Sequence, residues 1–212
     1  MSTPPVSAPP LAGLCTHAQA AAPGLSVDTT VMRLRRYVYL KSQSLFLMAG
    51  RFNALPEWEV KGALSLHLWQ EAEHSSWFRK RITEMRTPPH HLDKCPDPAL
   101  ESFAAELAKA QDSLEFLTGV YGVLKPALAD AFHTHLSQSN PITDQPTRRL
   151  VQFALEEEHT QLAWGEAALA ALSRAKSAAA AGPRLAAALG ELARSIESLP
   201  KDRFFYVLFF SG

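Results

Sequence analysis

Residues 68–77, LWQEAEHSSW, place Glu71 and His74 three positions apart within a helical pattern. Residues 155–164, LEEEHTQLAW, repeat this arrangement with Glu156 and His159. A Glu and a His at this spacing lie on one face of a helix, so two such helices can direct four ligands at a shared point. We therefore treat these four residues as candidate metal ligands.

The rest of the chain favours an all-α fold. Strand signals are nearly absent, whereas apolar residues recur at spacings of three and four between Pro and Gly breaks. We expect helices over residues 29–53 and 56–85, a short helix followed by a long one kinked at Pro126 over residues 98–139, and a fourth long helix over residues 144–181. Four long helices in two pairs describe a four-helix bundle, here with a short extra C-terminal helix.

Three regions follow from this pattern. Residues 1–28 contain five prolines and one charged residue, which predicts a disordered Pro/Ala-rich leader rather than a signal peptide. Residues 29–181 form the bundle. Residues 182–212 hold the C-terminal helix and an apolar tail, RFFYVLFFSG, which we expect to pack on the bundle or on a partner subunit.

Composition limits the classes of partner. The 21 basic and 21 acidic residues balance, so a nucleic-acid partner is not expected. No uncharged apolar run is long enough to cross a membrane, and Cys15 and Cys95 belong to no Cys/His cluster, which favours a reduced, cytoplasmic setting. A homodimer is possible, and the sequence names no small-molecule substrate.

The inward stripe of each expected helix becomes polar near its middle. A buried charge is costly unless it is paired or bound to a metal, so these polar residues must satisfy one another or something held between them. The expected core network, beyond the four candidate ligands, consists of Lys41, Lys125, Tyr37, Tyr121, His67 and Gln152. His67 is interpreted as a hydrogen-bonded core histidine, with Gln152 in the equivalent place of the second half.

The two Glu-x-x-His motifs resemble those of the ferritin-like di-iron carboxylate superfamily over roughly residues 29–170. In that superfamily, two helices each supply a Glu-x-x-His and two others each supply a Glu, and together they bind two metal ions. The resemblance implies that Glu71, His74, Glu156 and His159 bind iron or manganese, commonly for oxygen activation or iron oxidation.

The chain departs from the superfamily at the other two carboxylates. No Asp or Glu occurs in residues 31–56 or 116–129. The corresponding helices instead carry YVYLK, ending at Lys41, and YGVLK, ending at Lys125. Each lysine precedes the first Glu of a motif by about thirty residues, so the whole arrangement occurs twice, which indicates an internal duplication of a helical hairpin.

Counting charges leads to the leading hypothesis. Two lysines against Glu71 and Glu156 sum to zero without metal, so the ammonium groups could take the electrostatic role of two ions. We therefore expect a degenerate dimetal centre, no cofactor, and a structural, binding or non-redox role. The alternative is an atypical non-haem iron or manganese oxidoreductase that uses the four candidate ligands. Two simpler readings also stand: lysines that extend to solvent, and tyrosines that only fill space.

Overall fold

The computed structural model describes residues 9–87, 92, 94–96 and 98–177. Over these residues the chain is helical and contains no strand, which confirms the all-α prediction. The long helices are α2 (Val27–Arg51), α3 (Trp58–Glu84), α6 (Lys125–Gln138) and α7 (Gln145–Ser177). The shorter ones are η1 (Pro10–Gly13), α1 (His17–Ala21), α4 (Pro98–Ala108), α5 (Ser113–Leu117) and the π-helix η2 (Thr118–Leu124). No helix among the described residues is both long and apolar enough to cross a membrane.

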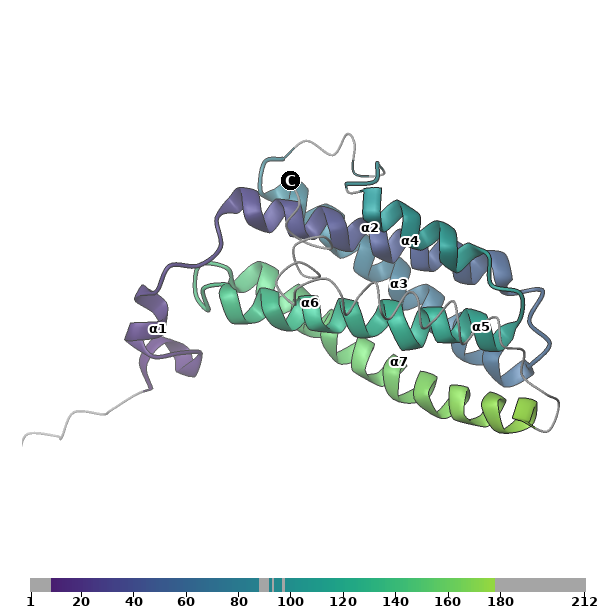
Figure 1. The fold of residues 1–212 in the computed structure, drawn as a ribbon. Helices are drawn as coiled ribbons and strands as arrows, with labels where there is room; N and C mark the ends of the chain where they lie inside the picture. The colour runs from purple at the N-terminus through teal and green to yellow at the C-terminus, as the bar shows by residue number, and fades with distance from the viewer. Residues whose placement is uncertain (1–8, 88–91, 93, 97, 178–212) are drawn as a thin grey trace, which may run out of the picture.

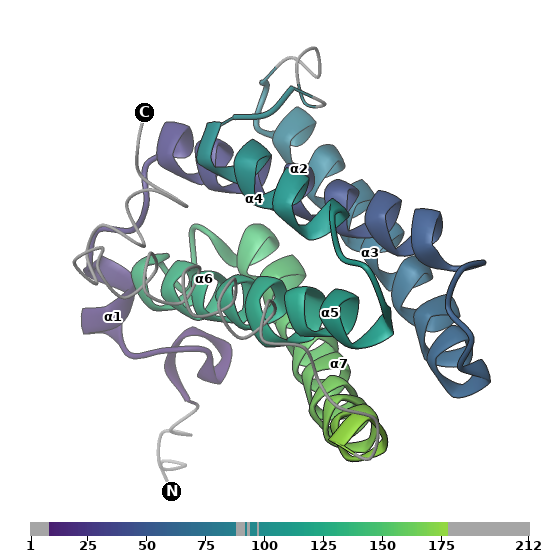
Figure 2. The same ribbon diagram turned by 45° about the vertical axis from the view of Figure 1, so that its right-hand side comes forward.

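The helices pair as two hairpins. α2 packs along α3, α6 packs along α7, and the two hairpins meet through α3 and α7. Figures 1 and 2 show α4 beside α2 on one side and α5 in line with α6 on the other. The core between them is built from fully buried apolar side chains of every long helix, among them Leu34, Met48, Leu64, Phe78, Leu128, Phe132, Val151 and Ala154.

Local signals explain where the helices begin. The Ser26 hydroxyl accepts a hydrogen bond from the Thr29 backbone N–H and caps α2. α2 therefore begins at Val27, two residues before the expected start at residue 29. Asp112 caps α5 in the same way through the Glu115 N–H. The Asp144 carboxylate accepts from the Asn140 N–H and orders the turn that leads into α7.

The kink expected at Pro126 takes the form of the π-helix η2. Proline lacks an N–H, so the backbone before it must change its bonding pattern. The Lys125 N–H bonds the Val120 carbonyl five residues back, and Pro126 then stands in the first turn of α6, where no donor is needed. This change of pitch lies directly before Lys125.

The region expected to be a disordered leader includes ordered turns where the structure describes it. Thr16 and Gln19 form a reciprocal capping box on α1. The Asn140 side chain donates to the carbonyls of Ala20 and Ala22, which attaches this region to the α6–α7 turn. Position 24 accepts only glycine without a shift of its neighbours, because an added Cβ would lie 2.7 Å from the Asn140 backbone nitrogen. The predicted C-terminal helix and apolar tail, residues 182–212, fall outside the described residues.

Candidate charged core site

Four fully buried charged side chains form a closed quartet between the hairpins: Lys41 of α2, Glu71 of α3, Lys125 of α6 and Glu158 of α7. Lys41 Nζ donates to Glu71 Oε1 at 2.9 Å and also to Glu158 Oε1. Lys125 Nζ lies 2.7 Å from Glu71 Oε1 and 3.4 Å from Glu158 Oε2. Each ammonium group therefore bridges both carboxylates, and each hairpin supplies one charge of each sign.

The electrostatics of the quartet are self-compensating. Burial alone lowers the pKa of Lys41, but the carboxylates of Glu158 and Glu71 outweigh it and raise that pKa above its ordinary value. Burial alone raises the pKa of Glu71, but the charges of Lys125 and Lys41 outweigh burial and hold the pKa of Glu71 well below its usual range. Both groups therefore remain charged at neutral pH, and the four formal charges sum to zero.

Aromatic rings border the lysines on both sides. Lys41 Nζ lies 5.8 Å from the centre of the Phe132 ring, and Lys125 Nζ lies 5.9 Å from that of Tyr121. Both distances are within the range of a cation–π contact. The rings add a favourable field for the ammonium groups and separate them from solvent.

Tyr121 forms a tight pair with His67 beside the quartet. The Tyr121 hydroxyl lies 2.5 Å from His67 Nδ1, and the Trp164 ring contacts both residues edge-on. Burial and the nearby Lys125 lower the pKa of His67 to about 4, so the ring is neutral. Its Nδ1 accepts a hydrogen bond from the Tyr121 hydroxyl. Gly165 makes room for this arrangement, because a Cβ there would lie 2.5 Å from Cδ1 of Tyr121.

Tyr37 occupies the matching place before Lys41. Its hydroxyl donates to the Ala131 carbonyl at 3.3 Å and lies 3.4 Å from His135 Nδ1. Burial lowers the pKa of His135 to about 3 and raises that of the Tyr37 phenol, so both groups are neutral. Each tyrosine thus stands four residues before a quartet lysine and contacts a buried neutral histidine.

His74 lies one turn along α3 from Glu71. Burial, with repulsion from Lys41, lowers the pKa of His74 to about 2, so its ring is neutral. Nε2 lies 2.8 Å from Glu157 Oε2 and acts as the donor, which leaves Nδ1 as an acceptor. Next to it, the Gln161 amide donates to Gln70 Oε1 at 2.7 Å.

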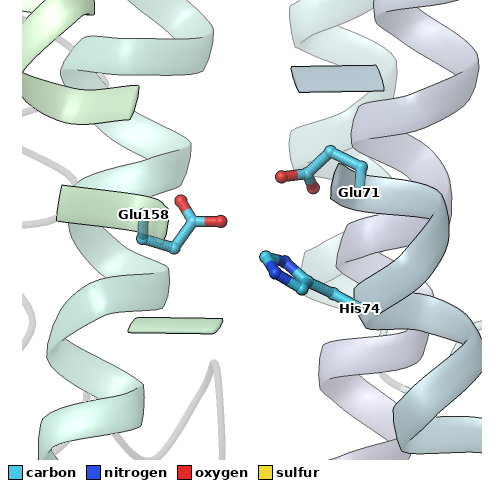
Figure 3. Close-up of side chains that lie close together, drawn as sticks. All are labelled: Glu71, His74 and Glu158. Carbon is cyan, nitrogen blue, oxygen red and sulfur yellow. The ribbon is translucent and has the colours of Figure 1, made fainter. Parts of the chain in front are cut away.

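Several buried acceptor atoms near the quartet lack a hydrogen-bond partner among the described residues: Glu71 Oε2, His74 Nδ1 and Gln161 Oε1. One ligand atom each from Glu71, His74 and Glu158 lies within 4.8 Å of the others, and Figure 3 shows these side chains pointing toward one another from facing helices. This set could hold one cation. It does not fit two divalent ions, because both carboxylates already contact two ammonium groups.

The structure corrects the second half of the predicted site. Glu156, His159 and Gln152 were expected in the core, yet all three are exposed on α7. The buried residues are Glu158 and Gln161, two positions further along, which corresponds to a rotation of about 200° at 100° per residue. Glu71, His74, Lys41, Lys125, Tyr37, Tyr121 and His67 are buried as expected.

The signal for the correct register lies in the apolar residues of α7. Val151, Ala154 and Leu155 are buried, and residues 151, 154, 158, 161 and 165 continue one helical face. The run Glu156-Glu157-Glu158 offers a carboxylate on any face, so matching the Glu-x-x-His spacing alone selected the wrong one. In the observed register, the second hairpin presents Glu158-x-x-Gln161 where the first presents Glu71-x-x-His74.

Comparisons of the chain with protein-family models, with curated proteins and with solved structures find no match.

Proposed function

We propose that this protein is a ferritin-like four-helix bundle whose dimetal centre has been replaced by the Lys41, Lys125, Glu71 and Glu158 quartet, and that its role is structural or binding rather than redox. The observation that carries the proposal is the double bridging: each ammonium group contacts both carboxylates. In the ferritin-like superfamily, two metal ions lie between glutamates of different helices. The two ammonium groups occupy the corresponding place here, between glutamates of different hairpins.

The burial of the quartet supports a role that does not depend on substrate reaching it. All four side chains are fully buried. In the described part of the chain, a pocket of about 370 Å³ lies instead between the α2–α3 turn and the start of α5, where Arg51, Glu57, Asp112 and Leu172 are among its lining residues. Binding functions of this chain therefore belong to its outer surface, and the quartet joins the two hairpins beneath it.

The test restores the missing carboxylates. The Lys41→Glu and Lys125→Glu double variant would place four glutamates and His74 around one point, a set suited to divalent iron or manganese. Without metal, four buried carboxylates repel one another, so we expect a marked loss of thermal stability. Iron or manganese that binds only the folded state should then raise the melting temperature of the double variant, whereas wild type should show little such response.

A matched control carries the same charge change on the surface. Lys80→Glu with Lys109→Glu replaces two exposed lysines and should show neither the loss of stability nor the metal response. Strong stabilisation of wild type by iron or manganese, with no response from the core double variant, would overturn the proposal.

The cluster of Glu71, His74 and Glu158 favours one second candidate, an atypical iron or manganese oxidoreductase with a single ion. The unpartnered Glu71 Oε2 and His74 Nδ1 are the atoms that would bind it. Such an ion would require Lys41 and Lys125 to lose their protons or turn away. Metal analysis of protein purified without chelator separates the candidates, because a stoichiometric transition metal bound at His74 favours this enzyme.

A further inference from the structure

A pair of exposed histidines joins α6 to α7 on the outside of the second hairpin. The ring centres of His133 and His159 are 5.3 Å apart, and the ring planes differ by 35°. Both side chains are exposed, so ions in solution can reach them. The pair is separate from the quartet, whose α7 residue Glu158 is buried.

The separation of the rings matches that of two imidazoles on one tetrahedral ion. A zinc–nitrogen bond of about 2.1 Å places the metal about 3.2 Å from the ring centre. At a tetrahedral angle, two such rings are then about 5.2 Å apart. The observed 5.3 Å is close to this value, so the two rings are spaced as two imidazoles on one ion would be.

Each histidine has a carboxylate one turn before it on its own helix. Asp130 precedes His133 on α6, and Glu156 precedes His159 on α7, and both acidic side chains are exposed. Residues three apart share a helical face, so either carboxylate can approach an ion held by the histidines. Two carboxylates also offset the charge of a divalent cation.

The backbone beneath the pair is fixed in advance. α6 and α7 pack against each other, and the turn between them is held by bonds from Arg148 to the Leu136 and Ser139 carbonyls. The two backbone positions that carry the histidines are thus fixed before any ion arrives, which lowers the entropic cost of forming a site.

We propose that His133 and His159 form a surface site for one divalent transition ion of the zinc class, completed by Asp130 or Glu156 and by water. Imidazole is a ligand that such ions prefer, whereas magnesium and calcium require oxygen ligands. An ion there links α6 to α7 and stabilises the second hairpin. This site is independent of the function proposed for the core.

The test is calorimetric titration of the full chain with Zn²⁺ at pH 7.5. We expect one equivalent to bind to wild type, with at least tenfold weaker binding in His133→Ala and in His159→Ala. His17→Ala removes an exposed histidine from α1 and should bind as wild type does. Circular dichroism of each variant should match wild type, because both histidines are exposed.

A further titration sharpens the result. Mg²⁺ in place of Zn²⁺ should give no binding that depends on these histidines. A loss of affinity smaller than tenfold in either His133→Ala or His159→Ala overturns the site.

Discussion

His67, His74 and His135 show how single buried residues make this fold sensitive to acid. Burial lowers their pKa values to about 4, 2 and 3, respectively, against 6.5 in the unfolded chain. As pH falls below 6.5, these histidines therefore bind protons in the unfolded chain but remain neutral in the folded chain. The stability contributed by each neutral ring is complete above pH 6.5 and is lost progressively toward its folded pKa.

The first prediction concerns His135, which is fully buried beside Tyr37. Between pH 7 and pH 5, one such histidine should remove about 2 kcal/mol from the free energy of unfolding. His135→Gln keeps a polar side chain of similar size without a titrating ring. Urea unfolding at several pH values should therefore show a pH dependence weaker by about this amount.

His17 supplies the control, because its ring is exposed. His17→Gln should leave the pH dependence as in wild type. An equal pH dependence in wild type and His135→Gln would show that the His135 ring is protonated within the fold.

The π-helix η2 and α7 fit together through one glycine. η2 directs Tyr121 toward His67, and Gly165 of α7 leaves space for the ring. An added methyl group would displace Tyr121 and weaken its bond to His67. Overpacking of a buried contact of this kind costs about 1 to 3 kcal/mol.

The second prediction compares two glycine substitutions in long helices. Gly165→Ala should lower the free energy of unfolding by about 1 to 3 kcal/mol despite the better helix propensity of alanine. Gly62→Ala in α3, where a Cβ meets nothing within 4 Å, should raise it by about 0.5 to 1 kcal/mol. Chemical denaturation measures both, and stabilisation by both substitutions would show that the Tyr121 ring moves aside freely.

The elements also show what the sequence could and could not predict. The helices, their hairpin pairing and the inward faces of α2 and α3 follow from apolar spacing, and Lys41, Glu71 and Lys125 are buried as that spacing implies. α7 was harder to assign in this way, because its alanines and its run of three glutamates fit more than one face. Val151, Ala154 and Leu155 favour the face that holds Glu158, and the contact of Gly165 with Tyr121 on that same face could not be read from the sequence.

The π-helix was only partly foreseeable. Pro126 indicates a disturbance in the third long helix, but a kink, a break and a π-turn all relieve its missing hydrogen bond. The structure takes the π-turn. Tyr121 lies within this turn, and Lys125 follows it as the first residue of α6.

For the molecule as a whole, the quartet is the polar connection between the two hairpins. Lys41 and Glu71 belong to one hairpin and Lys125 and Glu158 to the other. Two of the four lysine–carboxylate contacts, Lys41–Glu158 and Lys125–Glu71, join one hairpin to the other. Removing one charged side chain leaves a net charge on the other three in the core. Removing all four leaves no buried charge there.

The last prediction uses this difference. Lys41→Met alone leaves two carboxylates facing one ammonium group and should cost about 3 to 5 kcal/mol of stability. A quadruple variant, with methionine at both lysines and leucine at Glu71 and Glu158, should be as stable as wild type or more so, because buried ion pairs barely recover their desolvation cost. Thermal and urea unfolding, with circular dichroism to confirm helical content, compare the two variants.

Each outcome bears on the role of the quartet. A stable quadruple variant means that the charges are not needed for stability, so they serve to align the hairpins in one register or to exclude metal ions from the core. Titration with iron or manganese should then leave the quadruple variant unaffected, since it has lost both carboxylates. If the quadruple variant is as unstable as Lys41→Met, the four charges act together as a net stabilising network, and their role in the protein is structural.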